Sequence, residues 1–150
     1  MEAVRVVQPA DRAEWLRMHH SLWPHGELAE HGAEIDQYFV EAGLGVVFVA
    51  PRPTDGLQGF VEVGIRTYAE GCATSQVGYI EGWYVDADVR RQGVGQALIA
   101  AAEAWAVTQG CTEMGSDTEL HNVVSQAAHT RLGYVETERL VHFRKLLPGS

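Results

Sequence analysis

The sequence predicts an α+β fold in which a central mixed β-sheet is flanked by about four helices. Apolar segments of strand length alternate with segments of helical periodicity, in the order βααβββαβαβ. A turn rich in proline and glycine joins two neighbouring strands, so these two strands are expected to be antiparallel. No repeat, low-complexity segment or linker divides the 150 residues, and we expect a single domain over residues 1–150.

The N-terminal part predicts one short strand and two helices. Val4–Val7 is typical of a short opening strand. Asp11 is a candidate N-cap, and Glu14, three residues later, would complete a capping box. The apolar residues of this first helix recur at i, i+3 and i+7 and share one face: Trp15, Met18 and Leu22. A weaker helical pattern covers Ala33–Glu41.

The rest of the chain predicts a hairpin followed by alternating strands and helices. Val46–Ala50 and Gly59–Arg66 flank the turn at residues 51–56 and form the hairpin. The later segments are the strand Val77–Val85, the helix Gln96–Thr108, the strand Thr112–Asp117, the helix Asn122–Leu132, and one or two closing strands over Val135–Leu147.

Composition excludes some classes of partner. The formal net charge is −9, and nucleic-acid binding depends on Lys and Arg that release counterions, so we expect no nucleic-acid partner. The same charge attracts cations, although solubility alone explains it equally well. Cys72 and Cys111 lie far apart and outside any CxxC pattern, which favours reduced thiols. No apolar run is long enough for a signal peptide or a membrane span, so we expect a cytoplasmic protein with no membrane partner.

A glycine-containing turn between a strand and a helix is the clearest functional motif. It has the sequence Arg90-Arg91-Gln92-Gly93-Val94-Gly95. The first four N–H groups of a helix have no partner inside the helix, and the helix dipole adds positive charge at that end. The turn therefore predicts an anion site suited to a pyrophosphate, with the two arginines as additional donors. Two glycines near a helix start are a weak signal alone, because they often serve only the turn.

The full segment resembles the acyl-CoA signature of the GCN5-related N-acetyltransferases, written Q/R-x-x-G-x-G/A, and the element order agrees with that superfamily. The resemblance implies the fold of that superfamily and acetyl-CoA as co-substrate, with no metal. It implies that the end of the preceding strand binds the pantetheine arm through Trp83, Tyr84 and Val85. The residues implied around the pyrophosphate are Arg90, Arg91, Gln92, Gly93, Val94, Gly95 and Gln96.

The second half of that signature is an early helical asparagine and a later LGF-type ending, which Asn122 and Leu132-Gly133-Tyr134 match. The resemblance implies a hydrogen bond from Asn122 to the cofactor; capping of the helix is the alternative, and both can hold. Many family members carry a tyrosine five residues before the final aromatic residue, which protonates the departing thiolate. This chain has His129 there, which serves either as that acid or as a half-buried helix residue.

Two carboxylates are candidates for handling the acceptor amine, which must lose a proton before it can attack. Glu81 lies inside the apolar strand Val77–Val85, where burial would raise its pKa toward that of a useful base. The alternative is an exposed position or a salt bridge with Arg66. Asp117 lies at the C-terminal end of the neighbouring strand, where ligands of parallel segments bind. Its alternative is capping the loop that follows.

A closer resemblance, to the aminoglycoside 6'-N-acetyltransferases, extends along the whole chain. The motifs that carry it are Leu22-Trp23-Pro24, Ile80-Glu81-Gly82, Glu113-Met114-Gly115-Ser116-Asp117-Thr118 and Glu136-Thr137-Glu138-Arg139. It implies an antibiotic-resistance enzyme with a polycationic aminoglycoside as substrate. The substrate-contacting residues that it implies are Trp23, His25, Tyr68, Glu81, Asp117 and Glu138. It also implies a homodimer, in which the strand Val135–Leu147 could pair across the interface.

The mechanism expected from these residues is direct transfer in a ternary complex. Glu81 accepts the amine proton through water, and a backbone N–H near Trp83–Val85 polarises the thioester carbonyl. Two alternatives stay open: acetylation of another amine, such as a polyamine or a protein N-terminus, and a non-catalytic acyl-CoA sensor.

Overall fold

The computed structural model describes residues 3–41, 43 and 45–149. The chain divides into two units, Met1–Asp117 and Thr118–Ser150. The first unit holds the sheet and three α-helices, and the second holds one α-helix followed by an extended segment. Within the described residues, no helix is long and apolar enough to cross a bilayer.

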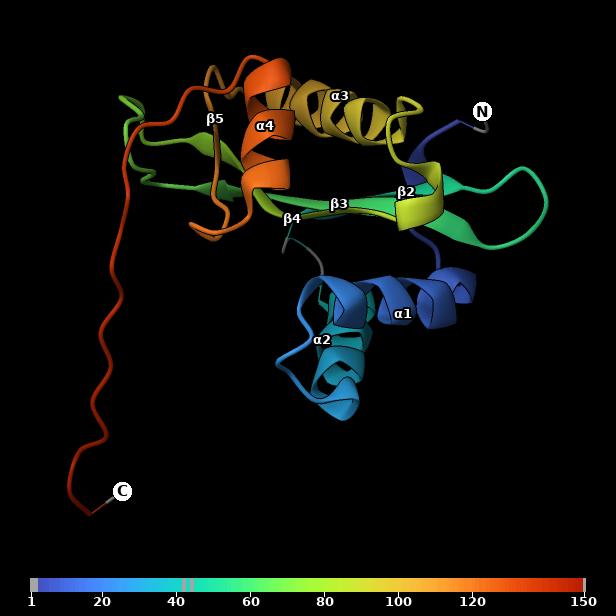
Figure 1. Cartoon of the computed structure of the whole chain (residues 1–150), viewed down its shortest axis with the longest axis horizontal. Helices are drawn as coiled ribbons and strands as arrows, with labels where there is room; N and C mark the ends of the chain where they lie inside the picture. Colours follow the sequence, from blue (N-terminus) through green and yellow to red (C-terminus); the bar gives the residue numbers. More distant parts are fainter. Residues whose placement is uncertain (1–2, 42, 44, 150) are drawn as a thin grey trace. The chain divides into compact units, whose positions relative to one another are not determined.

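Five strands of the first unit form one mixed sheet (Figure 1). In sheet order, which is also chain order, they are β1 (Arg5–Val6), β2 (Val46–Pro51), β3 (Leu57–Arg66), β4 (Val77–Val85) and β5 (Met114–Ser116). Neighbours are antiparallel from β1 to β4, whereas β5 runs parallel to β4 after a helical crossover. The predicted mixed sheet is confirmed.

Helices cover both faces of this sheet. Two of them, α1 (Arg12–Leu22) and α2 (Leu28–Val40), lie on one face, and α3 (Val94–Thr108) lies on the other (Figure 1). A Cβ on Gly82 would lie 2.5 Å from the Trp23 ring, at the end of α1. A Cβ on Gly78 would lie 2.7 Å from Ala106 of α3. Two glycines of β4 therefore let the helices approach the sheet closely on both sides.

Large side chains fill the space between the sheet and the first two helices. The buried residues that meet there are Trp15, Met18, Ile35, Val49 and Phe60. Each side chain of this kind stabilises the fold by about 1.5–3 kcal/mol when it is fully buried. This packing fixes α1 and α2 on the sheet, so polar side chains between them keep defined positions.

The predicted capping box at Asp11 and Glu14 is wrong. A short 3-10 turn, η1 (Pro9–Asp11), precedes α1, and the Asp11 carboxylate accepts the backbone N–H of Gln8 at 2.8 Å. Glu14 instead accepts the backbone N–H of Leu57 at 2.9 Å. Asp11 is therefore the third residue of a turn that begins at Gln8, and Glu14 links α1 to β3.

A β-bulge interrupts the pairing of β3 with β4. Glu62 lies opposite Gly82, but the next pair is Val63 with Ile80, so Glu81 is the extra residue of β4. Beyond the bulge β4 remains paired with β3, whereas β5 pairs only with Gly78–Ile80. The bulge therefore divides β4 into two parts. Gly78–Ile80 lie between β3 and β5, whereas Gly82–Val85 pair with β3 alone.

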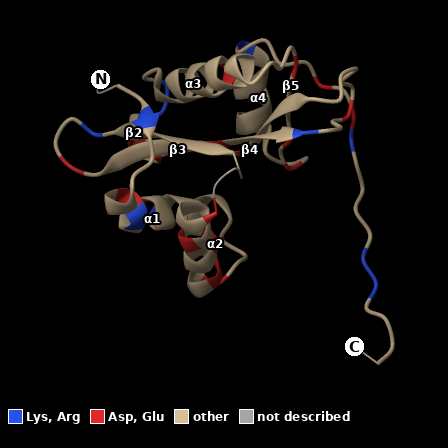
Figure 2. Cartoon of the chain, turned by 180° about the vertical axis from the view of Figure 1, so that it is seen from behind, with Lys and Arg blue, Asp and Glu red and all other residues tan. Residues whose placement is uncertain are grey.

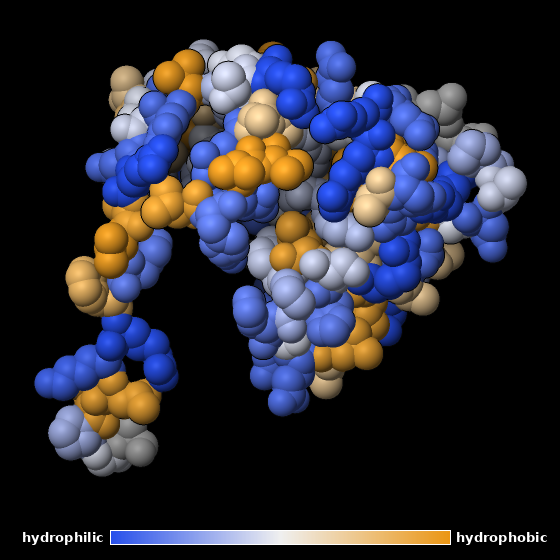
Figure 3. Space-filling model, in the orientation of Figure 1, coloured by the Kyte–Doolittle hydropathy of each residue, from blue (hydrophilic) through white to orange (hydrophobic). Residues whose placement is uncertain are grey.

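The closing strands predicted over Val135–Leu147 are absent from the described part of the chain. The second unit consists of α4 (Val123–Arg131), a turn and an extended segment without regular structure. A strand needs a neighbouring strand to pair its N–H and C=O groups, and α4 offers none. Apolar side chains follow this segment (Figure 3), and Val141 and Phe143 are 78% and 92% exposed.

Candidate active site

The predicted anion-binding turn has a backbone that leaves N–H groups at the start of α3 free to bind an anion. Arg91 and Gly93 adopt left-handed conformations, with φ of 66° and 85°, and α3 begins directly afterwards at Val94. The N–H of Ala97 donates to the carbonyl of Gly93 at 3.0 Å and closes the first turn. The N–H groups before Ala97 are those that an α-helix leaves without internal partners. Because Arg91 and Gly93 are exposed, a diphosphate can reach this end of the helix.

The two glycines of the turn have different tasks. A Cβ on Gly93 would meet no atom within 4 Å, so this glycine is required by its positive φ. A Cβ on Gly95 would lie 3.1 Å from the Trp83 ring. Gly95 therefore lets Trp83, at the end of β4, pack against the start of α3, which joins the expected pantetheine and pyrophosphate sites.

The end of β4 suits an extended ligand. Trp83, Tyr84 and Val85 pair with β3 on one side, and β5 stops short of them on the other. A pantetheine arm carries amide groups, which can hydrogen-bond along a strand edge as a further strand does. Arg90 donates from Nε to the carbonyl of Val85 at 3.2 Å and so holds the turn to the end of the strand. These residues fit a CoA thioester.

Glu81 is exposed rather than buried, which corrects the expected environment of this residue. As the extra residue of the bulge it lies outside the regular alternation of β4. Its two oxygens accept hydrogen bonds from Arg66, at 2.9 Å from Nε and 2.6 Å from Nη2. The alternative of a salt bridge with Arg66 is therefore confirmed.

Arg66 also links Glu81 to Asp117. The guanidinium carbon lies 3.6 Å from the centre of the Tyr79 ring, in a cation–π contact. The hydroxyl of Tyr79 donates to Asp117 at 2.6 Å. The two carboxylates predicted to face the acceptor thus belong to one network, at the centre of which is the side chain of Arg66.

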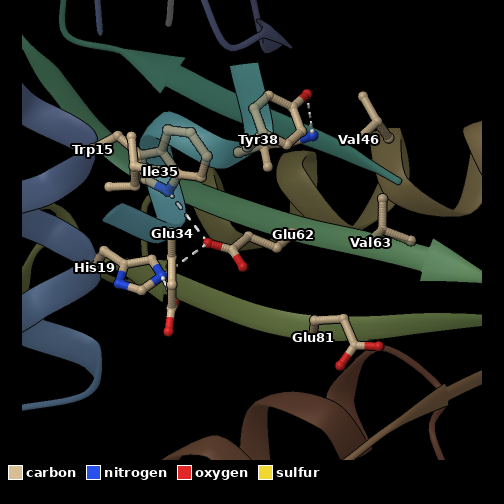
Figure 4. Close-up of a pocket in the computed structure, with 10 residues that line it drawn as sticks. Trp15, His19, Glu34, Ile35, Tyr38, Val46, Glu62, Val63 and Glu81 are labelled. Carbon is tan, nitrogen blue, oxygen red and sulfur yellow. Dashed lines mark hydrogen bonds and ion pairs between the residues drawn. The ribbon is translucent and has the colours of Figure 1, made fainter. Parts of the chain in front are cut away.

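A cavity of about 160 Å³ lies beside Glu81, between α1, α2 and the sheet (Figure 4). Its lining residues are Trp15, His19, Glu34, Ile35, Tyr38, Val46, Val47, Glu62, Val63 and Glu81. Glu62 is the functional candidate that the sequence prediction missed. It lies between Val61 and Val63 in the predicted strand Gly59–Arg66, and a carboxylate among apolar strand residues is the same signal that singled out Glu81.

Glu62 is held inside the cavity by two neighbours. Trp15 donates from Nε1 to its carboxylate at 3.3 Å, and Nε2 of His19 lies 3.5 Å from the same oxygen. Burial raises the pKa of Glu62 to about 7, with the charges of Glu34 and Glu81 adding to the effect and the Trp15 hydrogen bond opposing it. Glu62 therefore titrates near neutral pH in the free protein.

The histidine beside Glu62 is neutral at physiological pH. Burial lowers the pKa of His19 to about 4, and the nearby His31 contributes in the same direction. The two Nδ1 atoms lie 2.6 Å apart, so one ring donates to the other. Ligand atoms of His19, His31 and Glu34 lie within 4.8 Å of one another, close enough to hold a metal ion.

The other predicted substrate residues of the first unit differ in their exposure and contacts. Trp23 is half-buried, packs on His19 with ring centres 4.6 Å apart, and lies against Gly82. It thereby fixes the end of α1 beside the bulge. His25 is exposed, and Tyr68 is 68% exposed; neither lines the cavity.

Three candidates belong to the second unit. Asn122 caps α4, because its Oδ1 accepts the N–H of Ser125 at 3.1 Å, which confirms the capping alternative. His129 is half-buried in α4, with Nδ1 2.7 Å from the carbonyl of Ser125 and its ring edge-on to Tyr134. Glu138 is exposed in the extended segment. The functional roles of these three residues stay predictions.

Comparison with known proteins points to one family. Residues 12–134 match the acetyltransferase (GNAT) family. An aminoglycoside N(6')-acetyltransferase type 1 of Klebsiella aerogenes is 45% identical over 146 residues, which cover 96% of this chain and 96% of that protein. A protein of the same name from Stenotrophomonas maltophilia is 40% identical over 148 residues, covering 98% of this chain and 95% of its own.

Solved structures agree with the sequence relatives. The apo crystal structure of the aminoglycoside antibiotic 6'-N-acetyltransferase AAC(6')-IG from Acinetobacter haemolyticus has a TM-score of 0.88 and 36% identity, over 97% of this chain and 99% of that one. The structure of AAC(6')-Iy in complex with the bisubstrate analogue CoA-S-monomethyl-acetylneamine has a TM-score of 0.87 and 33% identity, over 96% and 97%.

Proposed function

The chain belongs to the acetyltransferase (GNAT) family and, within it, to the aminoglycoside N(6')-acetyltransferases, and from this premise we propose that it transfers the acetyl group of acetyl-CoA to the 6'-amino group of aminoglycoside antibiotics. The main observation behind the proposal is that two suitable sites meet along β4. A turn suited to an anion follows the strand, and the carboxylates of Glu81 and Glu62 lie beside its bulge. Such an enzyme would confer resistance to these antibiotics.

The acceptor side of the molecule suits a polycation. Figure 2 shows that acidic residues occur along α2, a helix with no Lys or Arg, and Glu34 of this helix lines the cavity. Together with the net charge of −9, this distribution attracts an aminoglycoside that carries several ammonium groups. We assign substrate contacts to Trp23, His25, Tyr68, Glu81, Asp117 and Glu138 as proposals based on the sequence resemblance.

The donor binds along the end of β4 and at the start of α3. In this proposal Trp83, Tyr84 and Val85 hold the pantetheine arm, and the segment from Arg90 to Gln96 holds the pyrophosphate. Asn122 adds a hydrogen bond to the cofactor while it caps α4. A backbone N–H of β4 beyond the bulge polarises the thioester carbonyl as negative charge develops on its oxygen.

On the acceptor side, an ammonium group of the substrate replaces the Arg66 guanidinium at Glu81. Both are cations, so the carboxylate keeps a charged partner throughout the exchange. Glu81 then accepts the proton of the ammonium through a water molecule, and the neutral amine attacks the thioester. The departing thiolate takes a proton from His129 or from water.

Direct transfer is favoured over an acyl-enzyme because neither cysteine is suited as a nucleophile. Cys111 is buried, and burial raises the pKa of the half-buried Cys72, so that its thiolate is scarce at neutral pH. The bisubstrate analogue bound to AAC(6')-Iy joins CoA to an acetylneamine group, which supports a ternary complex in this chain as well. Thiolate departure needs no metal in this scheme, and full activity in excess EDTA is the expected result.

The experiment that tests the proposal is a substrate panel with acetyl-CoA, in which thiol release is followed. We expect turnover with aminoglycosides that carry a 6'-amino group and none with those that carry a 6'-hydroxyl group. Turnover limited to polyamines or peptides would support another acceptor. Acetyl-CoA binding without turnover on any amine would support a non-catalytic sensor.

The proposal extends to the organisation of the protein. The family match crosses the boundary between the two units, so we propose that both belong to one catalytic domain. The extended, exposed and partly apolar segment Val135–Leu147 needs a strand partner, and a second copy of the chain is the proposed one, giving a homodimer. Because acetyl-CoA is a metabolite of the cytoplasm, we propose that the enzyme acts there.

A further inference from the structure

Glu62 is an enclosed titratable group that has no role in the proposed acetyl transfer. It belongs to β3, opposite Gly82, and projects into the cavity that Glu81 lines at β4 (Figure 4). Its side chain is only 20% exposed, whereas that of Glu81 is 39% exposed. A carboxylate this enclosed is rare unless it is paired with a cation or has a function. Within the described residues, no Lys or Arg forms an ion pair with it.

We propose that Glu62, held by Trp15 and His19 in the cavity beside the bulge, is the carboxylate on which the proton of the acceptor amine rests during acetyl transfer. The inference deepens the proposed function and depends on it. Glu81 and its water receive the proton from the ammonium group and pass it on, so that the lasting O–H bond forms on Glu62 and Glu81 stays ionised. The neutral amine attacks the carbonyl, the C–S bond breaks, and the attacking nitrogen releases a second proton, which reaches the thiolate through water or replaces the one that His129 gave.

The contacts of Glu62 suit this task better than those of Glu81. Both oxygens of Glu81 accept hydrogen bonds from Arg66, a permanent cation. The partners of Glu62 are neutral: the indole N–H of Trp15 and the imidazole of His19. A carboxylate with neutral partners in an enclosed site gains a proton far more easily than one bound to a guanidinium. Glu81 therefore remains the partner of a cation, either Arg66 or the substrate ammonium group, whereas Glu62 retains the proton.

All charged and titratable groups around Glu62 are consistent with this division. In addition to His19 from α1, it faces Glu34 and Tyr38 from α2 and Glu81 from β4. β2 contributes only Val46 and Val47 to the cavity wall. The acidic groups favour the protonated form of Glu62, which matches a pKa of about 7. A bound polycation opposes this effect, so the substrate itself helps to ionise the base.

His19 positions this base. If Nε2–H of His19 points at Glu62, then Nδ1 of His19 must accept from Nδ1–H of His31, 2.6 Å away. Both rings are buried, with exposed fractions of 4% and 6%, and cannot turn freely. In this tautomer the pair holds the His19 ring in place and directs its Nε2–H at the Glu62 carboxylate.

The test compares Glu62→Gln with the wild type and with Glu30→Gln, an exposed position on α2 outside the cavity lining. We expect kcat/KM of the wild type for an aminoglycoside to fall below about pH 7, the range in which Glu62 gains a proton. Glu62→Gln should lose this acidic limb and about 10²–10³-fold in kcat. Its KM for acetyl-CoA should stay within about twofold, and Glu30→Gln should behave as the wild type.

If Glu62→Gln does not fold, the variant Glu62→Asp and a direct titration of the Glu62 carboxyl group still test the inference. Glu62→Asp keeps a carboxylate and should retain part of kcat together with a displaced acidic limb. Carboxyl carbon NMR of wild-type protein should show one glutamate that titrates near pH 7 and is missing in Glu62→Asp.

The outcomes separate the two proposals. Glu62→Gln with wild-type kcat and an unchanged acidic limb would overturn the inference and leave the proposed function intact. A wild-type enzyme that releases no thiol with any aminoglycoside would overturn both.

Discussion

Arg66 and Glu62 show how single residues organise the proposed acceptor side. Arg66 bonds to Glu81 and stacks on Tyr79, which in turn donates to Asp117. A cation of the protein therefore holds the place that a cation of the substrate is proposed to take. Glu62 lies deeper, beside neutral partners, and keeps a titratable proton close to that place.

The pKa of Glu62 has a consequence for stability that can be measured apart from activity. Its folded-state pKa of about 7 lies above the ordinary value of 4.5, so the folded state binds the proton more tightly. The free energy of unfolding contributed by this group is complete below pH 4.5 and is lost as the pH rises to 7. Glu62→Gln should remove this loss, which is on the order of 2–3 kcal/mol.

Urea unfolding at pH 5 and pH 8 checks this prediction, with Glu30→Gln as the matched control. His19 acts in the opposite sense: its pKa of about 4 lies below the ordinary 6.5, so its contribution is lost as the pH falls from 6.5 toward 4. The difference between Glu62→Gln and the wild type isolates Glu62 from this effect. An equal pH dependence in both proteins would contradict the prediction.

At the scale of elements, the start of α3 combines a conformational requirement with the proposed binding of the cofactor diphosphate. Gly93 has a φ of 85°, and an added Cβ would meet no atom within 4 Å. Gly93→Ala should cost about 1–2 kcal/mol of stability through backbone strain. It should also raise KM for acetyl-CoA severalfold, because the strained N–H groups no longer point at the diphosphate.

Gly43→Ala is the control for this prediction. Gly43 has a φ of 95°, is exposed and also has open space around its Cβ position, but it lies outside the cofactor turn. It should lose similar stability and keep the wild-type KM for acetyl-CoA. If both variants raised KM equally, the effect would come from destabilisation alone.

Most elements could be predicted from the sequence because local patterns determine them. The strand Val77–Val85 was predicted to the residue, and the Asn122 cap was given as an alternative. The bulge could not be predicted, since it depends on the register of β3 against β4. That register also decides that Glu81 is exposed and that Glu62 shares its cavity, so apolar flanking residues alone could not rank the two carboxylates.

At the scale of the whole molecule, the segment Val135–Leu147 has the composition of a strand, but the described residues 118–149 of its unit contain no strand to pair with it. Truncation after Tyr134 should convert the proposed homodimer to a monomer, because the pairing surface is removed. Light scattering on the full-length and truncated proteins measures this. A full-length protein that is monomeric at micromolar concentration would contradict the proposal.

The net charge of −9 predicts a rate that depends on salt. Screening shortens the Debye length to about 10 Å at 0.1 M ionic strength, so capture of a polycationic antibiotic should slow as salt is added. We expect kcat/KM for the antibiotic to fall about tenfold between 0.01 and 0.3 M NaCl. The value for a monocationic amine acceptor should change much less, and equal changes for both would argue against steering by charge.

The bulge at Glu81 also bears on how the antibiotic range of such an enzyme can diverge. It makes β4 two segments whose side-chain alternation is set independently, because the extra residue absorbs the difference between them. Mutations before the bulge can reshape the proposed acceptor pocket without turning Trp83–Val85 away from the proposed donor site. A resistance enzyme with this strand can therefore change which antibiotics it acetylates and still use acetyl-CoA as the donor.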